Sequence, residues 1–468
     1  MRRNPVLRVY NRCSRGEVRL TTETTAVKVS TADGRASKTG SDLSARLALC
    51  VFVVVGISIV FAVPVLVPHQ WFYLDEWDFL ATRSAGNLND LMRPHYGHWV
   101  TLPVLLYRGL FSVFGLRTYL PYQLPVDVLH VVVAALLRVI MRRAGVGPWI
   151  ATAAAGLYAL FGSGFEELAR GFQVTFVAAL VFGLAQLILA DHDGPIDRRD
   201  WLGLSAGAVG LLCSSGVAII MVAVVGVAVL LRRGWRVAAF HTAPLALIYG
   251  VWWLVVARHY PARIVSSSAL TRLPDIVGWV KTQAVASFDA MGELPGFGAV
   301  LGGVLIVGLV LAWRSRNGEE RRKLSASTAL LIGAPIFAAA GAWQRAKPNG
   351  ASLGYAIDSH FLDVLAALVL PGIAVAADAI ARRWRILLPA MLALFLIGIP
   401  GNLQKLRNPV GYQASTQTAY RNALLAVAAL PIANSLPRSS QPSPLYLPIC
   451  GSATDRPDGS YDPDVCIK

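Results

Sequence analysis

The chain has 468 residues, of which 55% are hydrophobic and only 15% are charged. A soluble protein would carry roughly 25% charged residues, so the composition excludes a globular enzyme with one anchor and indicates a polytopic helical membrane protein. The net charge of +16 does not indicate nucleic acid, because cytoplasmic loops of membrane proteins are enriched in Lys and Arg and no recognised nucleic-acid-binding motif accompanies the charge.

The first segment, residues 1–45, is polar, basic and rich in Ser, Thr and Gly. This composition predicts a disordered cytoplasmic tail without a cleavable signal peptide. The apolar run Leu47–Val67 follows without any charge. It is long enough to cross a bilayer, for which about 20 residues suffice.

Hydropathy predicts about eleven membrane-spanning helices, and therefore an all-α fold, within a membrane domain at 46–401. The predicted spans are 47–68, 119–140, 148–163, 167–190, 201–214, 216–232, 237–257, 297–313, 325–343, 362–380 and 386–401. With the N-terminus inside, each inner segment carries a basic cluster, as the positive-inside rule requires. These clusters are Arg142/Arg143, Arg198/Arg199, Arg232/Arg233/Arg236, Arg314 through Lys323, and Arg382/Arg383/Arg385. The C-terminal tail, 402–468, is then extracytoplasmic, and we expect the protein in the plasma membrane.

The segment "HQWFYLDEWDFL" places Asp75, Glu76 and Asp78 directly after the first span, among five aromatic residues. Carboxylates cost roughly 2.5–3.5 kcal/mol each at the centre of a membrane helix. They are tolerated at the interface or facing a wet cavity, where they usually serve a function. A solvated helix cap is the alternative interpretation. The aromatic side chains could stack on sugars, although an interfacial belt is their commoner role.

The rest of the first outer loop, about 69–118, alternates apolar patches with His95, His98 and Arg117. Charges interrupt it too often for a span, and its aromatic content suits helices that lie in the headgroup layer. His95 and His98 could bind metal or phosphate from one helix face. Pro94 and Gly97 favour a surface turn instead.

Further candidates lie at the outer ends of later spans. Glu167 and Arg170 form an i,i+3 helix pair or point into a cavity, and Arg345 and Lys347 lie in a late outer loop. Such an excess of outer cations departs from the positive-inside trend and favours an anionic ligand. Asp127 and His130, near the outer end of the second span, would line the active cavity or bond a neighbouring helix.

These residues suit the transfer of a sugar from a lipid phosphate at the outer leaflet. A carboxylate at the interface can take the proton of an acceptor hydroxyl. The leaving phosphate needs cations, supplied by Arg, Lys and His or by a divalent metal ion. No cofactor is strictly required, and a divalent metal ion is the one that this chemistry could use.

The segments "FYLDEWDFL", "RPHYGHWVTLP" and "GFEELARGFQVTF" resemble the GT-C superfamily of polyprenyl-phosphate-dependent glycosyltransferases. They look like an actinobacterial group related to the protein-mannosyl and aminoarabinose transferases, over about residues 47–400. The resemblance implies Asp75 as the catalytic base and Glu76 as its acidic neighbour. It places His95 and His98 in a histidine-containing loop motif. Asp78, three residues after Asp75, would share its helix face if the helix continues and would orient acceptor or metal. Where that group has an Arg-Tyr pair at the tenth span, this chain reads "DSHFLD".

The C-terminal tail contains Cys450 and Cys466, which enclose fifteen residues. On an extracytoplasmic face this spacing predicts a disulfide, and two unpaired thiols are the alternative.

The leading prediction is an inverting membrane glycosyltransferase that moves a sugar from a polyprenyl-phosphate donor to an extracytoplasmic hydroxyl of a glycan or protein, in cell-envelope synthesis. A transporter or flippase for a lipid-linked or anionic substrate is the alternative. It would place ionisable residues near span midpoints and show internal repeats, whereas the span middles are almost free of charge. An O-antigen-ligase-like enzyme would carry its large outer loop between late spans.

Overall fold

The computed structural model describes residues 32–408 except 69, 73–74, 261–271 and 348–349, together with 418–419, 421–423 and 426. The chain divides into two units, Met1–Ser44 and Ala45–Lys468, and the contacts given below lie within the second. The predicted disulfide, Cys450 with Cys466, lies outside the described residues.

The protein is an all-α polytopic membrane protein, and no β-strand occurs among the described residues. The first helices are α1 (Ala32–Leu66), α2 (Glu76–Ala81), α3 (Leu88–Met92), α4 (Thr101–Phe114), α5 (Leu120–Arg143), α6 (Pro148–Ala159), α7 (Glu166–Ala169), α8 (Val174–Ala190) and α9 (Arg198–Cys213). They are followed by α10 (Ser215–Arg233), α11 (Trp235–Val255), α12 (Leu273–Gly292), α13 (Phe297–Ser315), α14 (Gly318–Arg322), α15 (Ser325–Arg345), α16 (Ser359–Arg383), α17 (Leu388–Leu396) and α18 (Ile399–Arg407). Short 3₁₀ turns include η1 (Gly162–Gly164), η2 (Gly171–Gln173) and η3 (Ala257–His259).

Nine described helices are long and apolar enough to cross a membrane. They correspond to nine of the eleven predicted spans. The other two predicted spans are also helical, but α6 and α9 have only 12 and 16 residues. Helix α1 is described from Ala32 and α18 ends at Arg407, so helical structure extends past both predicted domain boundaries.

Helix α12 is a feature that hydropathy missed. It has 20 residues within a segment predicted to be an outer loop, and it packs against α13, α15 and α16. Asp275, Lys281 and Asp289 interrupt its apolar sequence, which explains why it does not read as a span.

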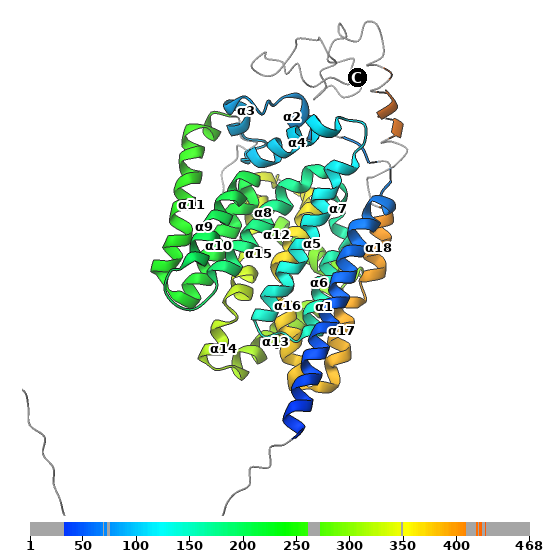
Figure 1. The fold of residues 1–468 in the computed structure, drawn as a ribbon, viewed down its shortest axis with the longest axis vertical. Helices are drawn as coiled ribbons and strands as arrows, with labels where there is room; N and C mark the ends of the chain where they lie inside the picture. Colours follow the sequence, from blue (N-terminus) through cyan, green and yellow to red (C-terminus); the bar gives the residue numbers. More distant parts are fainter. Residues whose placement is uncertain are drawn as a thin grey trace, which may run out of the picture. The chain divides into compact units, whose positions relative to one another are not determined.

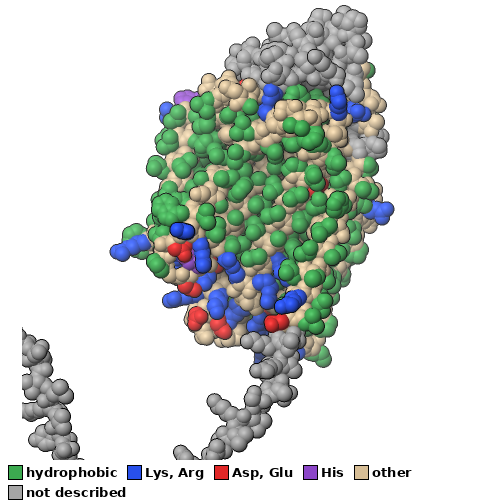
Figure 2. Space-filling model, in the orientation of Figure 1, with side chains coloured by type: hydrophobic (Ala, Val, Ile, Leu, Met, Phe, Trp, Pro, Cys, Tyr) green, Lys and Arg blue, Asp and Glu red, His purple; other side chains and the backbone are tan. Residues whose placement is uncertain are grey.

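Helix α16 occupies the centre of the bundle (Figure 1) and packs against α5, α6, α12, α13 and α15. Every residue from Phe361 to Ala381 is buried. By contrast, α1 and α11 expose many large apolar side chains. Figure 2 shows such side chains as a broad band across the middle of the visible face, with most charged side chains toward one end.

One end of the bundle, which we call the arginine-rich end, gathers three of the five predicted inner basic clusters. Arg316 and Arg382 donate hydrogen bonds to the carbonyls of Ala144 and Gly145, just after α5. Arg143, at the end of α5, donates to a carbonyl near the end of α8. Arginines near helix C-termini satisfy free carbonyls and complement the helix dipole. The clusters therefore share one end, as the predicted topology requires.

The short helices α2, α3 and α4 of the first predicted outer loop gather together (Figure 1), at the end of the bundle opposite α14. Trp99, just before α4, stacks on Trp252 of α11 with ring centroids 5.0 Å apart and an interplanar angle of 3°. Trp252 also donates a hydrogen bond to the carbonyl of Met92. These contacts fasten the loop helices to the membrane bundle.

Candidate functional site

The aromatic residues around the first acidic cluster form a packed core. Phe72 and Trp77 are fully buried, and Trp71 is 4% exposed. The ring of Phe72 lies 5.2 Å from that of Tyr119 and 4.7 Å from that of Tyr122, both edge-to-face. Such aromatic pairs contribute about 0.5–1.5 kcal/mol beyond burial. The described aromatic residues therefore hold α2 in place and are not exposed to stack on a sugar.

Glu76 is buried beneath these rings. Tyr107 and Tyr119 each donate a hydrogen bond of 2.6 Å to its Oε1 atom. Burial and the negative charge of Glu76 raise the pKa of both tyrosines well above the usual range, so both hydroxyls remain donors. Because Glu76 is 3% exposed, these contacts favour a role in holding α2 rather than in contacting a substrate.

Asp75 lies immediately before α2, and its side chain is 35% exposed. Its Oδ1 atom is 3.8 Å from Nε2 of His95. On the other side of the same imidazole, Nδ1 of His95 is 2.7 Å from Oδ2 of Asp78. One histidine therefore stands between two carboxylates, of which Asp75 is the more exposed.

Asp78 is fixed by an arginine that sequence reasoning missed. Arg83 is 1% exposed and contacts Oδ2 of Asp78 through Nε at 2.9 Å and Nη2 at 2.8 Å. It also donates to the carbonyls of Asp90, Arg93 and Pro94. Burial would raise the pKa of Asp78, but Arg83 and His95 hold it far below its usual range. Asp78 is therefore an ionised anchor.

His95 and His98 belong to a tight hairpin, as Pro94 and Gly97 predicted. The two residues exchange backbone hydrogen bonds of 2.9 Å, and the turn residues Tyr96 and Gly97 have φ of 47° and 88°. Positive φ at both central positions is typical of a type I′ turn. The histidines therefore do not share a helix face.

His98 packs against the first turn of α10, where a Cβ on Gly216 would lie 2.5 Å from its ring. Burial lowers the pKa of His98 to about 3, and the positive charges of Arg345, His95 and His360 add to this effect. His98 is therefore neutral, and it lies beside several cations that come from distant parts of the chain.

The "GFEELARGFQVTF" and "DSHFLD" segments meet at the same place. His95 contacts the ring of Phe172, and His98 that of Phe176. Phe176 contacts His360 at a centroid distance of 5.4 Å. Arg345 lies over the ring of Phe361, with its guanidinium carbon 4.9 Å from the centroid.

Glu166, rather than Glu167, is the ion-pair partner of Arg170. Nη1 of Arg170 lies 2.9 Å from Oε1 of Glu166, an i,i+4 pair. The i,i+3 pair considered for Glu167 and Arg170 is therefore not formed, and Glu166 pairs with Arg170 instead. We call the group consisting of Asp75, His95, His98, Glu166, Arg170, Arg345 and His360 the Asp75 cluster.

Three further candidates, Arg117, Lys347 and Glu167, are not members of the Asp75 cluster. Arg117, between α4 and α5, and Lys347, after α15, are exposed, and the backbone N–H of Lys347 donates to Ser352 Oγ at 2.8 Å. Glu167 is fully buried, and neither carboxyl oxygen has a hydrogen-bond partner. Burial, with Asp363 and Glu166 nearby, raises the pKa of Glu167 well above its usual range.

Glu167 belongs to a buried polar group that the sequence suggested only in part. Tyr158 donates a hydrogen bond of 2.6 Å to Oδ2 of Asp363, and Nδ1 of His130 lies 3.9 Å from Oδ1 of Asp363. Asp127 is fully buried, and neither of its carboxyl oxygens has a hydrogen-bond partner. Asp127 and His130 therefore point into the bundle interior and not into lipid.

Among the residues that the structure describes, one group has ligand atoms close enough together for a metal ion: His192, Asp197 and Asp200. It lies in the connection between α8 and α9. Arg233 donates to Oδ1 of Asp200 at 2.5 Å and lies 3.2 Å from Nε2 of His192. The guanidinium thus already supplies the positive charge there, which disfavours a metal.

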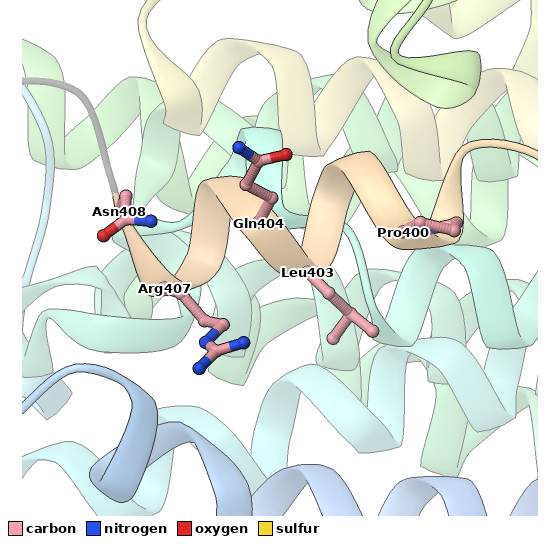
Figure 3. Close-up of a pocket in the computed structure, with 5 residues that line it drawn as sticks. All are labelled: Pro400, Leu403, Gln404, Arg407 and Asn408. Atoms are coloured by element: carbon pink, nitrogen blue, oxygen red, sulfur yellow. The ribbon is translucent and has the colours of Figure 1, made fainter.

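A groove of about 420 Å³ lies along α18, lined by Pro400, Leu403, Gln404, Arg407 and Asn408 (Figure 3). All five come from one helix and its C-terminus, and none belongs to the Asp75 cluster. We therefore do not assign the chemistry to this groove.

No family model matches the chain, and no curated protein matches it. One solved structure is similar: ArnT from Cupriavidus metallidurans bound to undecaprenyl phosphate, at 14% identity and a TM-score of 0.43. The match covers 81% of this chain and 79% of that one. A likeness at this level carries no weight for activity or substrate.

Proposed function

We propose that this protein is an inverting GT-C-type glycosyltransferase that uses a polyprenyl-phosphate-linked sugar as donor. One observation carries the proposal. The partly exposed carboxylate of Asp75 lies 3.8 Å from His95, and His95 shares a hairpin with His98, whose surroundings include Arg345 and His360 from distant segments. A carboxylate base next to a site for an anionic leaving group is what this transfer requires.

In the proposed reaction, the acceptor hydroxyl attacks the anomeric carbon while Asp75 takes its proton. The bond between the acceptor oxygen and the anomeric carbon forms, and the bond between that carbon and the phosphate oxygen breaks. The electron pair of the broken bond leaves with the lipid phosphate. Because the acceptor attacks the face opposite to the phosphate, the configuration of the anomeric centre is inverted.

The leaving phosphate would be held by Arg345 and His360, with the neutral His98 as a donor. Arg345 and His360 approach from α15 and α16, and their ring contacts with Phe361 orient them. Charge-assisted hydrogen bonds to phosphate are roughly twice as strong as neutral ones.

The basic clusters at the arginine-rich end support a location of the Asp75 cluster on the extracytoplasmic side of the plasma membrane. A lipid carrier would keep its donor phosphate at headgroup depth. An extracytoplasmic glycan or protein hydroxyl in the cell envelope would then be the acceptor.

The test uses the full chain in nanodiscs, with synthetic polyprenyl-phosphate monosaccharides as donors and octyl glycosides as acceptors. We expect release of polyprenyl phosphate that depends on the acceptor. Replacing Asp75, Glu76 and Asp78 together by their amides should abolish it, with the protein still inserted. Unchanged turnover in this triple variant would contradict the proposal.

A transporter for a lipid-linked or anionic substrate is the second candidate, and one observation favours it. Asp127, His130 and Asp363 place ionisable side chains inside membrane-spanning helices, where such residues often mark a transport path. Proteoliposomes separate the two functions. Movement of a labelled lipid-linked sugar between leaflets, without release of polyprenyl phosphate, would support transport.

A further inference from the structure

The imidazole of His95 is the link between the partly exposed carboxylate of Asp75 and the ionised carboxylate of Asp78. We propose that His95 is a positioning residue, whose imidazolium is clamped to Asp78 and orients the Asp75 carboxylate toward the acceptor. This inference rests on the proposed function for its kinetic consequence. The coupling between His95 and Asp75 is independent of any substrate.

Asp78 is held rigidly by its own hydrogen-bond partners. Asp78 receives hydrogen bonds on Oδ1 from Thr82 at 2.5 Å and on Oδ2 from Arg83 at 2.9 Å. Arg93 lies 3.5 Å from Oδ1. With its lone pairs engaged in this way, Asp78 cannot rotate freely, and it fixes Nδ1 of His95 at 2.7 Å.

The ring of His95 is held in place by its aromatic neighbours. His95 is 8% exposed, and its ring contacts those of Phe79, Tyr96 and Phe172 at centroid distances of 5.4, 4.5 and 5.3 Å. Three contacts from three segments prevent the imidazole from turning. Its Nε2 atom therefore stays directed at Asp75.

Nε2 is the nitrogen of His95 that faces Asp75. Nε2 of His95 is buried without a hydrogen-bond partner, and the 3.8 Å to Asp75 Oδ1 is longer than a hydrogen bond. A small rotation of the exposed carboxylate closes this gap. Because Asp75 has no other described ion pair, His95 is the group that selects its orientation.

The two carboxylates favour the charged form of His95. Burial alone would lower the pKa of His95, but the carboxylates of Asp75 and Asp78 raise it above the ordinary value. The imidazolium therefore carries a proton on each nitrogen, one for each carboxylate. A neutral ring bonded to Asp78 through Nδ1–H would turn a lone pair toward Asp75 and repel it.

The charged groups facing His95 are few. Asp75 immediately precedes α2, Asp78 lies within it and Arg83 follows it, and Arg93 and His98 lie close to His95 in the sequence, His98 in the same hairpin. His98 stays neutral because its pKa is about 3. The contact from η2 is Phe172, which has no charge. A titration near or above neutral pH in this group is therefore assigned to His95.

The first experiment needs no substrate. In ¹⁵N-histidine-labelled protein in nanodiscs, the His95 signals are assigned by their loss in His95→Gln. We expect both ring nitrogens to be protonated at pH 7, and the titration midpoint to fall by at least half a pH unit in Asp75→Asn. A midpoint that moves only in Asp78→Asn would overturn the proposal.

The second experiment is kinetic, with the polyprenyl-phosphate monosaccharides and octyl glycosides named above. His95→Gln should lower kcat by about 10- to 100-fold with less than a threefold change in KM, the scale of one charge-assisted hydrogen bond. His95→Lys, which restores a cation, should recover part of this loss. His259→Gln, an exposed histidine on η3, is the matched control and should leave kcat unchanged.

The two experiments separate the two hypotheses. If NMR shows that Asp75 and His95 are coupled but no sugar is transferred, the positioning role is retained and the glycosyltransferase function is rejected. Sugar transfer that His95→Gln leaves at the full rate would reject the positioning role and retain the enzyme.

Discussion

His360, the second residue of α16, lies with Nδ1 3.4 Å from Oε2 of Glu166 in α7, across 194 residues of sequence. Arg170 contacts the other oxygen of the same carboxylate at 2.9 Å. Burial would raise the pKa of Glu166, but His360 and Arg170 lower it to about 2. Glu166 is therefore a fixed negative charge among groups that we propose bind phosphate.

This relationship predicts that Glu166→Gln lowers the donor KM severalfold. Removing the carboxylate leaves the charge of Arg170 available to an anionic donor, as Coulomb's law requires for groups a few ångströms apart. Titrating the rate against donor concentration in nanodiscs measures the change. The double variant Glu166→Gln/Arg170→Ala should return KM to the original value or above it, and an increase in the single variant would contradict the assignment.

Asp75→Asn should lower kcat by about 10²–10⁴ because it preserves the shape of the side chain and removes the proton acceptor. Expression level and gel-filtration profile check that the variant is still folded. Near-normal turnover would show that another group is the base.

Glu76→Gln should act mainly on stability. Glu76 accepts two short hydrogen bonds from buried tyrosines, and hydrogen bonds to a charged group contribute about 1.5–3 kcal/mol. We expect a lower melting temperature in detergent and a smaller loss of kcat than in Asp75→Asn. A loss of kcat as large as that of Asp75→Asn, at unchanged melting temperature, would restore Glu76 as a catalytic residue.

The outer cations should differ in their effect on donor binding. Arg345→Ala should raise the donor KM about tenfold, or about 1.4 kcal/mol, because Arg345 is oriented by Phe361 and its charge acts on His98. The exposed residues Lys347 and Arg117 should contribute less. If neither Arg345→Ala nor Arg170→Ala changes donor kinetics, the phosphate is bound by the histidines or by a metal.

Glu167 should make the protein less stable as pH rises. Its raised pKa means that the folded state binds a proton that the unfolded state loses above the ordinary pKa of Glu. The free energy of unfolding therefore falls by up to about 1.4 kcal/mol per pH unit between the unfolded and folded pKa values. Melting temperatures of the wild type and of Glu167→Gln from pH 5 to 8 test this, since the amide should flatten the slope. Equal slopes would show that Glu167 is ionised.

The topology should be N-terminus inside and C-terminus outside. An impermeant thiol reagent should label Cys450 and Cys466 in intact cells after reduction, and before reduction we expect them to be joined. A disulfide of this loop length stabilises a chain by about 3 kcal/mol in the entropy model. Labelling only in broken cells would require one span more or fewer.

Hydropathy predicted most of the helices because lipid-facing helices must be apolar along their length. It missed α12 because Asp275, Lys281 and Asp289 lower the hydropathy of that segment. A helix that packs against other helices can carry such charges. Asp75 and His95 were candidates because charge at a membrane exit is costly. Arg83 was missed because a single arginine in a loop resembles a solvated residue, and only its partners show that it is a buried clamp.

The sequence also did not predict which residues of a short helix such as α7 face their partners. Glu166 and Glu167 are neighbours of the same type, and the one that meets Arg170 depends on where α7 begins. Their contact with α16 depends on packing between helices nearly two hundred residues apart. A local sequence pattern does not predict a contact between two residues so far apart in the sequence.

The enclosure of α16 has a consequence for biosynthesis. Every residue from Phe361 to Ala381 is buried, yet some three-quarters of the chain is synthesised before this helix is. We therefore expect that the helices around α16 complete their packing only after α16 has left the ribosome and entered the membrane. We expect chains truncated after Arg345 to be open to protease along α5 and α15, and chains that extend through Arg383 to be protected. Assembly of this protein would thus proceed from its periphery inward, with the central helix as the closing step.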